Sequence, residues 1–211
     1  MELEDALREA RAYFADKIKK FGPVPRGVDF NGPEAQATRF EQLVRIIDPR
    51  GPFQLIDYGC GYGALLGYLR AKGWTFTYHG YDELESMVEA GRKQYGEGPE
   101  ASFTTNETSL PPCDYLIAGS VFNIKFAASP ASWRDYTVHV LERMNGLCRK
   151  AFSFDMLTSY SDPDRMAQRP ELYFADPLFY FDHCKRAFSK DVALLHDYGL
   201  YDFTILVRKD R

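Results

Sequence analysis

The stretch FQLIDYGCGYGALLGYL, residues 53–69, is the feature that most constrains how this chain can fold. It opens with a short apolar run, which is typical of a strand buried on both faces of a parallel sheet. Gly59, Gly61 and Gly63 follow, where positive φ or a missing Cβ lets the backbone pass close to a ligand. The apolar pattern then resumes as in a helix. The order of strand, glycine loop and helix predicts a nucleotide-type ligand site at the carboxyl end of a first strand.

Asp57 indicates which kind of ligand the loop favours. The segment from Gly59 to Ala64 also satisfies the relaxed dinucleotide pattern G-x-G-x-x-G/A, so a dinucleotide site stays an alternative. However, a carboxylate two residues before the first glycine would repel a pyrophosphate and would suit a cationic ligand. No Lys-Ser/Thr pair follows the glycines, which excludes a P-loop.

At these residues, written DYGCGYG over 57–63, the chain resembles motif I of the class I S-adenosylmethionine-dependent methyltransferases. S-adenosylmethionine carries a sulfonium and an ammonium group and no phosphate, which agrees with an acid at position 57. The resemblance implies S-adenosyl-L-methionine as the cofactor and methyl transfer as the reaction. It also implies that Asp57, Cys60 and the three glycines contact the cofactor.

A second anchor follows the next predicted strand, residues 75–81, whose β-branched and aromatic residues alternate. The strand ends at Asp82, the place where a dinucleotide fold carries its ribose-binding acid. Asp82, with Glu83 as the second candidate, is therefore expected to accept hydrogen bonds from the ribose hydroxyls. The resemblance places Met87 near the adenine. The alternative role for Asp82 is to cap the helix predicted over residues 84–94.

The end of the chain defines the predicted topology. Residues 191–195 and 201–207 read as strands whose connection is too short for a crossover helix, so they form an antiparallel pair. With strands at 101–104, 113–119 and 149–158, this resembles the class I order 3-2-1-4-5-7-6, a doubly wound, mostly parallel seven-stranded α/β sheet. We expect one methyltransferase domain over residues 1–211, with a helical cover over 1–50 and a Rossmann-like core over 51–211. A helix is predicted over 132–145 with Gly146 as its stop, and another from Asp176-Pro177.

The amino-terminal segment is predicted to cover the ligand. An amphipathic helix over residues 2–21 precedes a loop rich in proline and glycine, and a second helix over 33–47 carries Gln36 and Arg39. Arg39 could clamp the methionine carboxylate with its planar guanidinium, or it could pair with a neighbouring acid. The resemblance further implies that Gly119 and Ser120 wrap the methionine portion.

Candidate catalytic residues lie near the carboxyl ends of the later strands. Asp155 could bind the acceptor or act as its base, or it could cap the following loop. His196 and Asp197 end the sixth strand, and Tyr160 could join an acceptor pocket. Asn123 occupies the place of a nucleic-acid amino-methylase tetrapeptide that this chain lacks, so it could orient a small acceptor. Methyl transfer depends mostly on alignment, and a base is needed only if the acceptor must lose a proton.

Charge and cysteine content narrow the partners. The 26 basic and 30 acidic side chains give a net charge of -4, which disfavours a nucleic acid as the standing partner. Four widely spaced cysteines without a CxxC pair suggest neither zinc nor disulfides, and no apolar run is long enough to span a membrane. We therefore expect a cytoplasmic monomer or homodimer that methylates a small molecule. The alternatives are an NAD(P)-dependent oxidoreductase and a non-catalytic S-adenosylmethionine-binding partner subunit.

Overall fold

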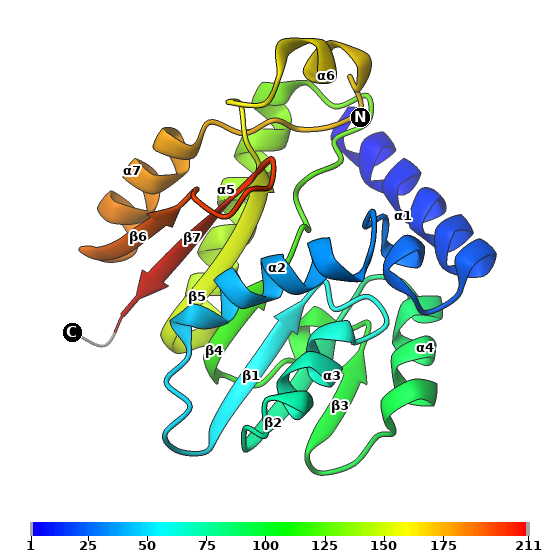
Figure 1. The fold of residues 1–211 in the computed structure, drawn as a ribbon, viewed down its shortest axis with the longest axis vertical. Coiled ribbons are helices and arrows are strands. Elements are labelled where there is room, and N and C mark those ends of the chain that lie inside the picture. The colour runs from blue at the N-terminus through cyan, green and yellow to red at the C-terminus, as the bar shows by residue number, and fades with distance from the viewer. Residues whose placement is uncertain (1, 210–211) are drawn as a thin grey trace.

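The computed structural model describes residues 2–209, which form a seven-stranded sheet of order β3-β2-β1-β4-β5-β7-β6 between layers of helices (Figure 1). The strands are β1 Phe53–Tyr58, β2 Phe76–Tyr81, β3 Ala101–Thr104, β4 Cys113–Ala118, β5 Cys148–Leu157, β6 Asp191–Leu195 and β7 Asp202–Arg208. Neighbours among β1 to β5 pair in parallel, whereas β7 runs antiparallel to both β5 and β6. The predicted strand order and the terminal hairpin are both confirmed.

Seven α-helices and three short 3-10 helices complete the described chain. The α-helices are α1 Glu2–Phe21, α2 Pro33–Leu43, α3 Ala64–Ala71, α4 Glu85–Tyr95, α5 Pro130–Leu147, α6 Pro163–Gln168 and α7 Pro177–Ala187. The 3-10 helices are η1 Pro25–Val28, η2 Val44–Ile46 and η3 Glu107–Ser109. The predicted helix over residues 2–21 is confirmed, and the connection from β5 to α7 contains α6.

Two apolar cores hold the layers together, one on each face of the sheet. In β1, successive side chains alternate between them: Leu55 packs with α2, α3 and α4, and Ile56 packs with α5 and α7. The same alternation in β5 puts Phe152, Phe154 and Met156 together on the α5 face. Burial of both faces explains why the central strands read as nearly continuous apolar runs.

The amino-terminal end of α7 is capped as predicted, whereas the carboxyl end of α5 differs from the prediction. The Asp176 carboxylate accepts a hydrogen bond from the Leu178 N–H at 2.9 Å, and proline occupies the first position of the helix. The prediction that Gly146 stops α5 is wrong, because the helix includes Gly146 and ends at Leu147. Leu147 packs on the core, and the N–H of Cys148, where β5 begins, bonds back to the Met144 carbonyl.

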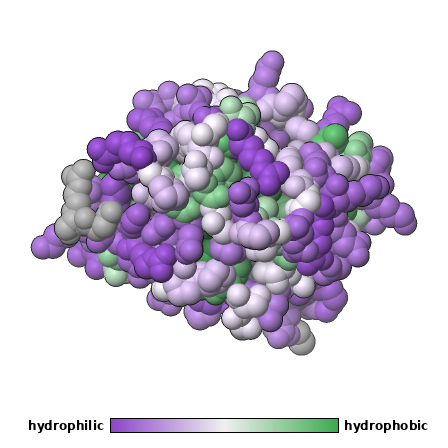
Figure 2. All heavy atoms as spheres, turned by 90° about the horizontal axis from the view of Figure 1, so that it is seen from below, coloured by the Kyte–Doolittle hydropathy of each residue, from purple (hydrophilic) through white to green (hydrophobic). Residues whose placement is uncertain are grey.

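The topology creates a crevice where β1 and β4 lie side by side. The chain leaves β1 toward α3 on one face and leaves β4 toward α5 on the other, which is the arrangement that opens a ligand site at carboxyl strand ends. Figure 2 shows the molecule from below, with hydrophilic residues over most of that face and apolar side chains only in patches between them. No helix within residues 2–209 is long and apolar enough to cross a membrane.

Candidate functional site

The glycine loop is tied to the end of β2 by its own backbone. The N–H groups of Gly59 and Cys60 both donate to the Tyr81 carbonyl at 2.8 Å. The Gly63 N–H donates to the Cys60 carbonyl at 2.9 Å, which closes the turn into α3. These donors are therefore engaged within the protein, and the loop is held against β2.

Asp82 completes this tie with its side chain. Its Oδ2 accepts a hydrogen bond from the Gly61 N–H at 2.9 Å, and its Oδ1 accepts one from the Leu84 N–H at 3.0 Å. The carboxylate thus supports the glycine loop and the entry into α4 together. Burial raises the pKa of Asp82 to about 6, while the two N–H donors act in the opposite direction. Gly61 has a φ of 52°, and a Cβ there would lie 2.9 Å from Val28 Cγ1, so both conformation and space favour glycine.

Asp57 lies at the end of β1 and is 5% exposed. The Tyr78 hydroxyl donates a hydrogen bond to Asp57 Oδ2 at 2.7 Å. The pKa of Asp57 is raised to about 7. Burial is the main cause and nearby Asp82 adds to it, while the hydrogen bond from the Tyr78 hydroxyl acts to lower the pKa. The carboxyl group therefore changes its protonation state near neutral pH.

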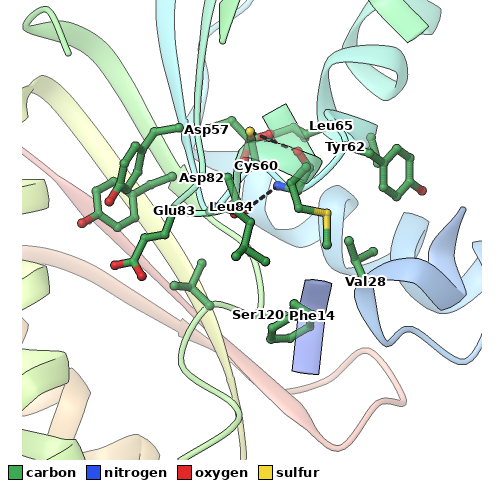
Figure 3. Close-up of a pocket in the computed structure, with 18 of the residues that line it drawn as sticks. Phe14, Val28, Asp57, Cys60, Tyr62, Leu65, Asp82, Glu83, Leu84 and Ser120 are labelled. Atoms are coloured by element: carbon green, nitrogen blue, oxygen red, sulfur yellow. Dashed lines mark hydrogen bonds between the residues drawn. The ribbon is translucent and has the colours of Figure 1, made fainter. Parts of the chain in front are cut away.

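A cavity of about 190 Å³ lies beside the glycine loop at the crevice between β1 and β4 (Figure 3). Most of the residues predicted to bind the cofactor line it: Gln36, Asp57, Gly59, Cys60, Gly61, Asp82, Glu83, Met87, Gly119 and Ser120. Gly63 does not, because the space at its Cα is filled by the Phe103 ring, 3.0 Å from where a Cβ would stand. The structure thus brings together residues from β1, β2, β4, α2 and α4.

The amino-terminal segment forms the opposite wall of the cavity. Figure 3 shows Phe14 and Val28 across the cavity from Asp57. Further lining residues come from α1 and the segment after it, namely Leu7, Ala10, Arg11 and Phe30. Arg11 pairs with Glu83 at 3.6 Å, and so links α1 to the end of β2. The amino-terminal segment therefore contributes a wall of the cavity, and Leu7, Ala10 and Phe14 belong to the apolar positions of the amphipathic helix predicted over residues 2–21.

Four aromatic residues line one side of the cavity and were not predicted. They are Tyr58, Tyr81, Trp133 and Tyr136. Tyr58 and Tyr81 directly neighbour the two acids in sequence and face the α5 side of the sheet, and their rings lie 4.9 Å apart. Adjacency to an acid at a strand end, with period-two alternation, is the sequence signal that could have identified them.

Arg39 and Asp155 lie behind the cavity wall instead of lining it. Arg39 Nη2 lies 2.6 Å from Asp202 Oδ2, and its Nε lies 3.6 Å from Asp155 Oδ2, so Arg39 takes the predicted alternative of pairing with acids. Asp155 Oδ1 accepts a hydrogen bond from the Ser120 N–H at 2.5 Å, and its Oδ2 accepts one from the Ser120 hydroxyl at 3.2 Å. Ser120 has a φ of 59°, so Asp155 holds a left-handed residue in the cavity wall.

The other candidate catalytic residues do not line the cavity. Asn123 is used structurally, since its Oδ1 accepts the Leu157 N–H at 2.9 Å. Tyr160 is 66% exposed, with its ring centroid 5.9 Å from that of His196. His196 and Asp197 follow β6, which two strands separate from β4 at the far edge of the sheet. Catalytic roles for these residues, and for Asp155, stay predictions.

The described residues, 2–209, offer neither a metal site nor a reactive thiolate. No group of three or more His, Cys, Asp or Glu side chains in that range is placed to hold a metal ion. Cys60, Cys113, Cys148 and Cys184 are all buried and free. Burial raises the pKa of the Cys60 thiol well above its ordinary value, so the cavity presents a thiol and not a thiolate.

Comparison with known proteins agrees with this geometry. The chain is 45% identical over 166 residues to "Putative methyltransferase Rv1506c" of Mycobacterium tuberculosis (strain ATCC 25618 / H37Rv), which covers 79% of this chain and 99% of that protein. No family model matches. The N-methyltransferase NodS from Bradyrhizobium japonicum WM9, solved with S-adenosyl-L-homocysteine, superposes with a TM-score of 0.66, 11% identity and coverage of 95% and 98% of the two chains. The plantazolicin methyltransferase BamL, solved with a triazolic desmethylPZN analog and S-adenosylhomocysteine, superposes with a TM-score of 0.61 and 10% identity. The match covers 99% of this chain and 100% of that chain.

With this relative, the strand order and the glycine loop between two acids, the chain belongs to the class I S-adenosylmethionine-dependent methyltransferase family. The two solved structures are below 25% identical, and their likeness shows the fold. The motif I resemblance seen in the sequence is therefore confirmed at the level of the family.

The buried cluster of Arg39, Asp155 and Asp202 generates a pH-dependent stability prediction. Burial raises the pKa of both acids, that of Asp155 to about 7, so the charged carboxylates oppose folding as the pH rises from about 4 toward 7. Arg39→Met removes the cation that offsets this charge. We expect the variant to lose roughly 3 to 5 kcal/mol of unfolding free energy at pH 7 and clearly less near pH 4, where Asp155 is neutral.

Urea unfolding at the two pH values measures the difference. Arg149→Met is the control, because Arg149 makes an exposed pair with Asp114 at 3.7 Å, and we expect it to change stability by less than about 1 kcal/mol. An Arg39→Met loss that is equal at pH 4 and pH 7 would contradict this account of the cluster.

Proposed function

We propose that this protein transfers a methyl group from S-adenosyl-L-methionine to a small-molecule acceptor. The observation that carries the proposal is the placement of Asp57 and Asp82 at the ends of adjacent strands, on either side of the glycine loop and both lining one cavity. Within residues 2–209 neither acid forms an ion pair with a basic side chain, so the pair suits a ligand with hydroxyl donors and positive charge. The family to which the chain belongs supports the same ligand.

The residues of the cavity divide naturally between the parts of such a cofactor. Asp82 would accept hydrogen bonds from the ribose hydroxyls, and Asp57 would face the ammonium end. Leu84 and Met87 offer apolar surface for the adenine, and the backbone around Ser120 would contact the methionine portion. When bound, the cofactor supplies a methyl group on a sulfonium with a neutral leaving group, so the protein's main task is to align the acceptor and exclude water.

The two alternative functions fit the site less well. A dinucleotide needs backbone donors for its pyrophosphate, whereas the N–H groups of Gly59, Cys60, Gly61 and Gly63 all bond within the protein. Asp57 would also repel that group. A non-catalytic binding subunit would need no acceptor space, yet the lining of this cavity includes four aromatic residues, Tyr58, Tyr81, Trp133 and Tyr136, that we assign to the acceptor.

The most direct test of the cofactor is calorimetric titration with S-adenosylhomocysteine and, separately, with NAD. We expect S-adenosylhomocysteine to bind and NAD not to bind. Asp82→Ala should weaken S-adenosylhomocysteine binding by at least about tenfold, because hydrogen bonds to a charged acceptor contribute roughly 1.5 to 3 kcal/mol each.

The control for this titration is Asp176→Ala, which removes the α7 cap and lies outside the cavity lining. It should leave the affinity unchanged while lowering thermal stability. NAD binding without S-adenosylhomocysteine binding would overturn the proposal. An Asp82→Ala variant of normal affinity would move the ribose contact to another residue.

The acceptor is proposed to be small because the cavity has a volume of about 190 Å³ and offers no unpaired cation to a polyanion. Among its lining residues within 2–209, Arg11 is the one basic side chain, and it is paired with Glu83. NodS is an N-methyltransferase and BamL is a plantazolicin methyltransferase, and these are the activities of those two proteins. For this chain we infer only that the acceptor enters between the aromatic wall and the amino-terminal cover.

Nucleic-acid binding provides a sharp check on the size of the acceptor. With a net charge of -4 and one paired cation at the cavity, we expect no salt-sensitive binding of labelled RNA or DNA between about 50 and 200 mM salt. Fluorescence anisotropy measures this directly. Tight binding that weakens steeply with salt would contradict a small-molecule acceptor.

A further inference from the structure

We propose that Tyr78 is a positioning residue for the cofactor site: its hydroxyl fixes one oxygen of Asp57 so that the other oxygen faces the ligand. The inference rests on the proposed function for the nature of that ligand. Tyr78 itself does not line the cavity, so it would act through Asp57. The sequence analysis gave Tyr78 no role beyond a place in a predicted strand.

The ring of Tyr78 is held in a fixed position by its surroundings. The side chain is fully buried in β2, two residues before Gly80, on the same face as Asp57 of the adjacent strand. A Cβ at Gly80 would lie 2.9 Å from Tyr78 Cε1, so glycine leaves the room that the ring occupies. On the next strand, the Phe103 ring packs against it with centroids 5.5 Å apart. A locked ring places its hydroxyl at a defined point, which is what precise orientation of a neighbour requires.

The two oxygens of Asp57 have different environments. Oδ2 accepts the hydrogen bond from Tyr78 at 2.7 Å, whereas no donor within residues 2–209 bonds to Oδ1. Asp57 lines the cavity, and Oδ1 is therefore the oxygen available to a donor on the ligand. A buried carboxylate with one oxygen anchored and one free is suited to accept a hydrogen bond from an ammonium group.

The same hydrogen bond favours the charged form of Asp57, which a cationic ligand needs. Asp57 titrates near neutral pH because burial and Asp82 raise its pKa, and the Tyr78 hydroxyl is the group that opposes them. The other groups facing this region are the Cys60 thiol of the glycine loop and, elsewhere on the cavity wall, Glu83 paired with Arg11 of α1. Helix α2 contributes the uncharged Gln36 and Phe40. No cation among these groups takes over the role of Tyr78.

The first arm of the test uses the protein without any ligand. Carboxyl-carbon NMR follows the titration of Asp57, which is assigned by the signal that disappears in Asp57→Asn. In Tyr78→Phe, which keeps the ring and its packing, the Asp57 midpoint should rise by about one pH unit. The charged carboxylate loses the hydrogen bond that stabilises it, so the neutral acid persists to higher pH. An unchanged midpoint would overturn the inference, whether or not the protein binds a cofactor.

The second arm measures S-adenosylhomocysteine binding by calorimetry between pH 5.5 and 8.5. The affinity of the natural chain should fall as the pH drops through the Asp57 midpoint, and in Tyr78→Phe it should be about tenfold weaker at pH 7, with the fall displaced to higher pH. Asp57→Asn should lose the part of that fall that is centred on the Asp57 midpoint, and a fall that remains near pH 6 is assigned to Asp82, which also lines the cavity. Failure of the natural chain to bind would count against the proposed function alone, since the NMR arm still judges Tyr78.

The matched control is Tyr180→Phe. Tyr180 is also fully buried, and its hydroxyl lies 3.1 Å from that of Tyr173, but it belongs to α7 and lies outside the cavity lining. This variant should lose stability without moving the Asp57 titration or the affinity. If Tyr78→Phe behaved like Tyr180→Phe, lowering only the unfolding temperature, then Tyr78 would be a packing residue and the inference would be wrong.

Discussion

The site depends on the carboxylate of Asp82 and the two backbone N–H groups that it accepts. One donor belongs to Gly61 in the loop after β1, and the other belongs to Leu84 at the entry to α4. With the two loop amides that bond to the end of β2, this fixes the position of the first two strand ends relative to each other. A partly buried acid in this role costs solvation, which its raised pKa records, and the bonds offset that cost. Without Asp82 the glycine loop would still be held to β2 through Gly59 and Cys60, but Gly61 would lose its link to the entry of α4.

Local pattern predicted the fold and most of the residues that line the cavity beside the glycine loop. Apolar runs, turn residues and the short final connection determine the strand order, because few topologies satisfy all three. Asp57 and Asp82 were identifiable because Asp57 lies at the end of one strand and Asp82 directly follows the next. Gly146 shows where local pattern fails: a glycine near a helix end suggested a stop, but packing of Leu147 on the core carries the helix past it.

The acceptor side could not be predicted in the same way. Asp155, at the end of β5, was expected to face the ligand, but its bonds to Ser120 and its proximity to Arg39 turn it into support for the cavity wall. Residues 196–197 follow the carboxyl end of β6, on the same side of the sheet as the cavity, but two strands separate β6 from β4. Which residue reaches the cavity depends on long-range packing. The amphipathic pattern of α1 predicts its apolar face, but that pattern does not show that Phe14 lines this cavity.

The central claim is that the cavity binds S-adenosyl ligands with the ribose on Asp82 and the ammonium group facing Asp57. A crystal structure of the protein with S-adenosylhomocysteine tests it most directly. The account predicts ribose hydroxyls within hydrogen-bond distance of Asp82, the amino group beside the free oxygen of Asp57, and α1 closed over the ligand. A ligand bound elsewhere, or bound here in the reverse direction with its adenine against Asp57, would contradict the account.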